Sequence, residues 1–299
     1  MDERYQYILT SEDTELPIKE LLKRRMAISS RLLRKLKAGD KVYLDGEKIR
    51  LYEKGREGSK ITIKFPEEKS NFPPQAISID VLYEDRDLLV INKQPGIVVH
   101  PTKGHPCNTI ANGIMNHMMD REESYKIRFI NRLDMFTSGV LLVGKNSYSQ
   151  DDFTRQAFAG EVVKSYILVV NGTVDGDRGT IDLPIAKLDE NDIKRAVISG
   201  GYNSITHYEV IERYSKGYTL LRAVLETGRT HQIRVHFSHL GHPVVGDNLY
   251  GGSSELIARQ ALHAEKLDFR HPATGENLSI RAPLPPDMEH LLTQININC

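Results

Sequence analysis

Hydrophobic and polar positions follow two different periods in the first quarter of the chain. Between residues 17 and 66, apolar residues recur first at the helical spacing in two short runs and then alternate with period two. Ser29, ahead of the second run, is a typical N-cap residue, and Asp45-Gly46 is a hairpin turn signal. The segment therefore predicts a small α/β module of two helices followed by a sheet.

The pattern weakens on both sides of this module. Residues 1–16 are polar and are interpreted as a separate N-terminal segment, and residues 67–77 are rich in proline and polar residues, as linkers between domains are. Residues 78–299 are long enough to form one large domain.

Short runs of β-branched residues follow one another through this large domain, separated by turn signals. Leu88–Asn92 and Ile97–His100 are expected to pair antiparallel around the turn Gln94-Pro95-Gly96. Further strands are predicted over 162–170, 204–214 and 218–226. The fold class is therefore α+β, with a mixed, mainly antiparallel sheet and peripheral helices.

Three helices are predicted around that sheet. One begins at Thr109, after a cap at Asn108, and another covers residues 150–158. The third is short and amphipathic, and it lies between Thr230, a suitable N-cap, and Gly241, a typical C′ residue.

Composition narrows the class of protein. Hydrophobic residues make up 39% of the chain, which is ordinary for a globular protein. The sequence contains no run of about 18 apolar residues that would span a bilayer and no apolar signal segment at its start. Cys107 and Cys299 form no spacing motif, which favours a reducing compartment, so we expect a cytoplasmic protein without membrane contact.

Charge is distributed unevenly although the formal net charge is zero. Residues 17–65 hold 15 Lys and Arg against 6 Asp and Glu, so the remainder carries the opposite excess. A basic module on a mildly acidic body is typical of RNA binding. Arg31, Arg34, Lys35 and Lys37 on the second predicted helix are the candidate RNA contacts, and a solvated basic helix face is the alternative.

The candidate chemistry lies between two apolar runs, 127–130 and 140–143, where Asp134 stands in a tight loop. A carboxylate between two buried strands needs a cation or hydrogen-bond donors to offset its desolvation. The alternative is a structural Asp that accepts hydrogen bonds from nearby backbone N–H groups in the turn.

Three motifs resemble one enzyme family. The string Asn131-Arg132-Leu133-Asp134-x-x-Thr137-Ser138-Gly139 resembles the H-R-L-D-x-x-T-S-G signature of RluA-type pseudouridine synthases, which modify uridines in large-subunit ribosomal RNA and in tRNA; Asn131 replaces the usual His. The segment 228–236 is similar to the family's G-R-T-H-Q-I-R-V-H, and Lys164-Ser165-Tyr166 to its K-x-Y. The N-terminal module resembles the RNA-binding module of the ribosomal protein S-four type.

The resemblance implies that the chain is an enzyme, an isomerase acting on specific uridines in structured RNA. It implies Asp134 as the nucleophile near the ribose C1′ and Arg234 as its ion-pair partner. Tyr166 would stack on the uracil or take a proton late in the reaction, and Ile233 would pack against the uracil. The reaction needs no cofactor, and nothing in the sequence demands an oligomer, so we expect a monomer.

The target base must leave the RNA stack, and the resemblance assigns Arg132 to the gap that it leaves. Arg132 acting only to neutralise Asp134 is the alternative. Arg229 and Asn131 are further candidates for contacts with the substrate.

Two other chemistries were weighed. His231, His236, His239 and His242 lack the spacing of a zinc-protease helix and have no cysteine to help them, so no metal site is expected. An aspartic hydrolase would need a second carboxylate loop, which the sequence does not repeat. A non-catalytic RNA-binding ribosome assembly factor is the alternative function.

Overall fold

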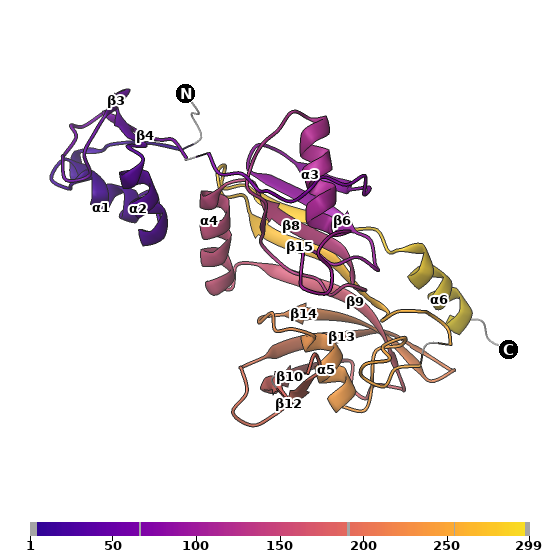
Figure 1. The fold of residues 1–299 in the computed structure, drawn as a ribbon. Helices are drawn as coiled ribbons and strands as arrows, with labels where there is room; N and C mark the ends of the chain where they lie inside the picture. Colours follow the sequence, from indigo (N-terminus) through magenta and orange to yellow (C-terminus); the bar gives the residue numbers. More distant parts are fainter. Residues whose placement is uncertain (1–4, 66, 190–191, 254, 297–299) are drawn as a thin grey trace.

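A computed structural model describes residues 5–65, 67–189, 192–253 and 255–296 (Figure 1). Residues 5–65 form a small N-terminal module, drawn in indigo at one side of Figure 1, and the remaining described residues form the body of the molecule. Within the described part of the chain, no helix is both long and apolar enough to cross a membrane.

The module is a four-stranded antiparallel sheet with two α-helices and one short 3₁₀ helix. Its strand order is β1 (Gln6–Ile8), β4 (Lys60–Ile63), β2 (Val42–Leu44) and β3 (Glu47–Lys48), and its helices are η1 (Ser11–Asp13), α1 (Ile18–Arg24) and α2 (Ser30–Ala38). Ser29 caps α2 as expected, because its hydroxyl accepts the N–H of Leu32 at 3.1 Å.

The N-terminal residues differ from the expectation of a separate segment. Tyr5 and Leu9 are buried in the core of the module, and β1 pairs with β4 along its whole length. Three alternating residues are too few to establish a period in the sequence, so only the pairing with β4 defines this strand.

The body is built on one large sheet. Its strand order is β10 (Arg178–Asp182), β13 (Ile205–Tyr214), β14 (Tyr218–Leu225), β9 (Val163–Asn171), β15 (Leu262–Arg270), β8 (Ser138–Gly144), β6 (Leu88–Lys93) and β5 (Asp80–Glu84), with β16 (Asn277–Arg281) beside β15 and β7 (Arg128–Phe129) beside β8. Among the described pairs, only β8 and β15 run parallel. A small hairpin, β11 (Ile185–Lys187) and β12 (Arg195–Val197), lies apart from the sheet. The predicted α+β class and mainly antiparallel sheet are confirmed.

Helices cover both faces of the sheet, which explains why β8 is buried along its whole length. Leu141 and Val143 point into the larger core, with residues of α3 (Ile110–Asp120), α5 (Gln232–His239) and α6 (Pro286–Asn296). Val140 and Leu142 point the other way, into a second core with Phe153 of α4 (Ser147–Phe158). A strand buried on both sides reads as a continuous apolar run, as this one does.

Three local expectations were wrong, the first of them for a tertiary reason. Ile97–His100 is not a strand of the sheet, because the carbonyls of Val98 and Val99 accept the first N–H groups of α3 instead. The cap of α3 is Thr109 and not Asn108, which adopts a left-handed conformation. At α5 the cap is His231 and not Thr230.

The module packs on the body at the N-terminal end of α4 (Figure 1). The ring of Tyr148 lies 5.0 Å from that of Tyr5 and 6.0 Å from that of Phe65, measured between centroids. Ser29 at the start of α2 donates a short hydrogen bond to Asp151 of α4. The start of α4 therefore lies directly beside the start of α2.

Candidate active site

Two buried basic side chains, Lys93 and Arg259, hold the loop that carries Asp134. The ammonium of Lys93, at the end of β6, donates to the carbonyls of Met135 at 2.8 Å and Thr137 at 2.9 Å. Arg259 donates to the carbonyl of Phe136 at 3.0 Å. Burial lowers the pKa of Lys93 to about 7, although the nearby Asp134 opposes the shift. Both cations bind backbone carbonyls, so they fix the path of the loop.

Asp134 meets a guanidinium that is shared with a second carboxylate. Nη1 of Arg234 donates to Oδ2 of Asp134 at 3.0 Å, while its Nε and Nη2 donate to Asp247 at 2.6 and 2.8 Å. Asp247 is 1% exposed and Asp134 is 26% exposed, so only Asp134 is within reach of a substrate. Burial opposes the charge on Arg234, but its hydrogen bonds to Asp247 hold its pKa above the usual value.

The predicted catalytic residues therefore lie together. Tyr166, on β9, lines the same space as Asp134, and burial together with the Asp134 charge raises the pKa of its phenol. Ile233, one position before Arg234 on α5, is buried and lines that space as well. A carboxylate, a neutral phenol, an apolar side chain and a fixed cation thus surround one pocket.

A cleft of about 600 Å³ leads to this pocket, and the predicted substrate contacts lie along it. Arg132 is exposed, and among the described residues it makes no hydrogen bond or ion pair, with Asp134 or with any other side chain. Arg229 stacks over the ring of Tyr202, 5.4 Å from its centroid. Asn131 lines the cleft, but its amide is engaged by the backbone of Val140 and Leu142 in β8.

The four basic residues predicted on α2 divide into two pairs. Arg31 and Lys35 line a groove of about 370 Å³ between module and body, here called the interdomain groove. Arg34 and Lys37 line a separate groove of about 760 Å³ on the module itself. The interdomain groove shares Arg132 with the active-site cleft, so the two are continuous.

Several residues of the site escaped the sequence analysis. Lys93 and Asp247 are buried ionisable groups that no spacing rule identifies, although a lysine at the end of an apolar strand is itself a signal. His231 lines the pocket beside Asp134 and was considered only as a metal ligand. Lys164 lines the cleft, and burial lowers its pKa.

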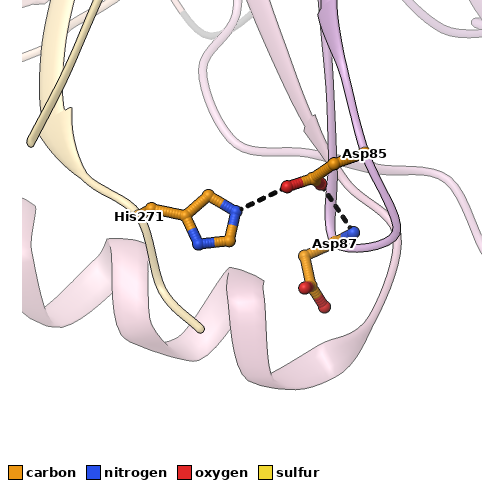
Figure 2. Close-up of side chains that lie close together, drawn as sticks. All are labelled: Asp85, Asp87 and His271. Atoms are coloured by element: carbon orange, nitrogen blue, oxygen red, sulfur yellow. Dashed lines mark hydrogen bonds and ion pairs between the residues drawn. The ribbon is translucent and has the colours of Figure 1, made fainter. Parts of the chain in front are cut away.

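The histidines that were considered as metal ligands do not form a cluster among the described residues. Both ring nitrogens of His236, for example, have oxygen partners, in Thr206 and Leu183. Within the described ranges, ligand-type side chains gather in one place only, where Asp85, Asp87 and His271 meet (Figure 2).

That cluster is a hydrogen-bonded support. Nδ1 of His271 accepts the N–H groups of Ala273 and Thr274, so its Nε2 carries a proton and donates to Asp85 at 2.8 Å, as Figure 2 shows. Asp87 accepts from Tyr5 of the module and from Asn146. Both ring nitrogens of His271 are thus engaged, and the hydrogen bonds of the cluster join the turn between β5 and β6 to the C-terminal strands and the module.

Comparison with known proteins defines the class to which this fold and pocket belong. Residues 87–239 match the family model described as RNA pseudouridylate synthase. The chain therefore belongs to the RNA pseudouridylate synthase family, and it is an RNA pseudouridine synthase, an isomerase. The match begins at the turn before β6 and ends with α5, so it includes the Asp134 loop, Tyr166 and Arg234.

Individual relatives extend the similarity over most of the chain. An uncharacterised RNA pseudouridine synthase of Bacillus subtilis, YjbO, is 40% identical over 89% of this chain and 95% of its own length. Ribosomal large subunit pseudouridine synthase D of Xanthomonas campestris is 38% identical over 89% of this chain and 84% of its own length. Among solved structures, human RNA pseudouridylate synthase domain containing 1 is 27% identical, with a TM-score of 0.59, over 73% of this chain and 89% of that one.

Proposed function

We propose that this enzyme isomerises uridines of large-subunit ribosomal RNA, with Asp134 as the nucleophile on a flipped-out nucleotide. The observation that carries the proposal is the asymmetry of the Asp134 carboxylate. Its Oδ2 is bound by Arg234, whereas no described residue donates a hydrogen bond to Oδ1. A carboxylate oxygen without a hydrogen-bond donor from the described residues, at the end of a cleft, is suited to attack an electrophilic carbon.

The steps conserve the composition of uridine. Oδ1 of Asp134 bonds to C1′ of the ribose while the bond from C1′ to N1 breaks, leaving its electron pair on the uracil. The uracil turns, its C5 bonds to C1′, and the carboxylate leaves with its electrons. C5 then loses its proton and N1 gains one. Tyr166 and Ile233 line the pocket in which the ring turns, and the guanidinium of Arg234 holds the Asp134 carboxylate in place.

The choice of substrate rests on similarity and on charge. Several relatives are named ribosomal large subunit pseudouridine synthase D. Arg132 is unpaired among the described residues and stands where the cleft meets the interdomain groove. A side chain that fills the space of an extruded base must be free and close to the pocket, and Arg132 meets both requirements. We assign phosphate contacts to Arg31, Arg34, Lys35 and Lys37 of the module. Action as a monomer in the cytoplasm stays a prediction.

The test is a map of pseudouridines in cellular RNA with and without the gene. We expect sites in large-subunit ribosomal RNA to disappear in its absence and to return with the wild-type protein. Asp134→Asn should restore none of them, while Asp175→Asn, a matched change at an exposed position, should restore all. Lost sites confined to tRNA would contradict the substrate, and sites restored by Asp134→Asn would contradict the nucleophile.

In vitro, Asp134→Asn should abolish product formation and leave RNA affinity within about twofold, because binding is distributed over many phosphate contacts. Filter binding and nucleoside chromatography, run on the same transcript, separate the two effects. A large loss of affinity in this variant would indicate that Asp134 supports the fold and not the chemistry.

A further inference from the structure

His231 occupies an unusual backbone position at the edge of the pocket. It is the N-cap of α5 with φ 60° and ψ 18°, the left-handed region, and its side chain does not cap the helix. Residues with a side chain seldom adopt this region, so the surrounding structure must hold His231 in it. The ring is therefore free of a helix-capping role, and its contacts must be sought on the pocket side.

The hydrogen bonds around the ring fix its tautomer. Oη of Tyr250 accepts the backbone N–H of Arg195 at 2.9 Å and lies 2.9 Å from Nδ1 of His231. The hydroxyl proton of Tyr250 has no other acceptor among the described residues, so it is donated to Nδ1. Nδ1 is then an acceptor, and the proton of the neutral imidazole sits on Nε2.

That Nε2–H group faces the nucleophile across a gap. Nε2 lies 3.9 Å from Oδ2 of Asp134, which is longer than a hydrogen bond, and within the described part of the chain no other acceptor contacts it. Both groups line a cavity of about 70 Å³ together with Tyr166. A donor is thus aimed at the space beside Asp134 that the flipped nucleotide must enter.

The charge state suits a donor that keeps its proton. Burial lowers the pKa of His231, and the nearby Asp134 only partly offsets this shift. The imidazole is therefore neutral at neutral pH. A neutral donor polarises a carbonyl, as an oxyanion-binding group does, without neutralising the carboxylate that must attack.

We propose that His231 is a further catalytic residue, whose Nε2–H donates a hydrogen bond to a carbonyl oxygen of the uracil when the bond between C1′ and N1 breaks. The inference rests on the proposed function of Asp134. The electron pair that leaves C1′ spreads over N1, O2 and O4 of the uracil, so a donor at one of the oxygens stabilises the departing anion. His231 keeps its proton throughout, and the balance of the reaction is unchanged.

The experiment uses the full-length enzyme and a synthetic RNA hairpin that carries one uridine identified by the mapping described above. Single-turnover rate constants are measured by nucleoside chromatography, and affinity by filter binding. We expect His231→Ala to lower the rate constant about 100- to 1,000-fold, the usual effect of removing an oxyanion donor, with affinity changed less than twofold. His231→Gln, whose amide N–H can replace Nε2–H, should recover part of the rate.

Three controls separate this role from a structural one. His239→Ala, the same change at an exposed position of α5, should behave as the wild type. Replacing O2 or O4 of the target uracil by sulfur, a poor acceptor, should slow the wild type at one of the two positions and slow His231→Ala no further there. Thermal unfolding of His231→Ala should change little.

Either of two results would overturn the proposal. One is a His231→Ala enzyme as fast as the wild type, and the other is additive effects of the variant and the sulfur substitution at both O2 and O4. Asp134→Asn in the same assay keeps the two proposals distinguishable: an active Asp134→Asn enzyme refutes the nucleophile, whereas an inactive one beside a fully active His231→Ala enzyme refutes the role of His231 alone.

Discussion

Arg234 holds two carboxylates with one guanidinium, and this sharing gives each carboxylate a different task. Asp247 takes the two-pronged contact, which orients the planar group, and Asp134 takes the remaining nitrogen. The buried Asp247 therefore fixes the direction in which Arg234 meets Asp134. The Asp134 carboxylate is thus held on the side of its Oδ2, and no described residue donates a hydrogen bond to its Oδ1.

Removing that guanidinium should damage stability as well as activity. Arg234→Ala leaves Asp247 buried without its partner, which costs about 3–5 kcal/mol for a buried ion pair broken on one side. Arg222→Ala is the control, since it breaks a partly exposed pair with Glu265, where the loss should be below about 1 kcal/mol. Urea unfolding gives both values, and equal losses in the two variants would contradict this account.

The motif match was enough to bring forward Asp134, Tyr166 and Arg234 as candidates, because a motif specifies the side chain at each position, and the three residues line one pocket. It did not find Lys93, whose three hydrogen bonds run to the backbone of residues near and far in the chain. Every residue has a backbone carbonyl, so a hydrogen bond to a carbonyl does not require any particular amino acid at that position. Supporting cations of this kind become visible only when the fold places them.

At the scale of elements, the Asp134 loop leads into the start of β8, which lies between β6 and β15. Gly139 has φ 109°, and a Cβ added there would lie 2.2 Å from the carbonyl oxygen of Ala264 in β15. The parallel contact between β8 and β15 therefore requires glycine at this position. The glycine of the T-S-G string is thus explained by the close packing of β8 against β15, next to the candidate active site.

Gly139→Ala should consequently destabilise the protein far more than a Gly→Ala change that introduces backbone strain alone. Gly251→Ala is the matched control, because Gly251 also has a positive φ, 91°, but open space around its Cβ position. The control should lose about 1 kcal/mol, whereas Gly139→Ala adds an overpacking cost of about 1–3 kcal/mol or more. Similar unfolding midpoints in urea for both variants would show that β8 and β15 can separate at little cost.

Elements with strong local signals were predicted well, and those defined by distant partners were not. The strands β9, β13 and β14 form where the runs of strand-favouring residues predicted them, and α2 begins at the expected cap. Residues 97–100 have the composition of a strand, but the start of α3 takes their hydrogen bonds. Propensity is a local quantity, and here a tertiary contact decided the outcome.

The turn between β5 and β6 joins the body, the C-terminal strands and the module through hydrogen bonds. The free energy of unfolding of the protein should therefore decrease at acidic pH. Burial opposes ionisation of Asp85, yet the hydrogen bonds from His271 and from backbone N–H groups lower its pKa below the usual value. A depressed pKa stabilises the folded state above the unfolded value of about 3.9, and this stabilisation is lost as pH falls towards the folded value.

Asp85→Asn should therefore be less stable than the wild type at neutral pH and should lose less stability on acidification. Unfolding midpoints in urea, measured from pH 6 to pH 2.5, give the two slopes. Parallel curves for the two proteins would mean that other carboxyl groups account for the acid sensitivity.

At the scale of the whole molecule, Glu68 of the linker binds cations from both parts: Lys35 of the module at 2.9 Å and Arg128 of the body. These cations lie in the interdomain groove with Arg31 and Arg132. The groove is rich in positive charge and continuous with the cleft, so we expect it to follow the RNA backbone on one side of the flipped uridine.

The double variant Arg31→Ala/Lys35→Ala should weaken RNA binding and flatten its salt dependence. Each single-stranded phosphate contact that is lost should reduce the slope of log affinity against log salt by roughly 0.7. Lys23→Ala/Arg24→Ala removes the same charge from α1, outside both grooves, and should leave the slope nearly unchanged. Equal slopes for the two double variants would remove the groove from the binding surface.

The contacts between Tyr148 and the module have a consequence for target choice. Because aromatic rings and hydrogen bonds join module and body, the distance between the pocket at Asp134 and the cations of α2 is set by the protein. If the cations of α2 bind phosphates as proposed, we expect a uridine to be accepted only when its strand presents phosphates at that same spacing. The site would then be selected by the shape of the folded RNA and not by the bases in between.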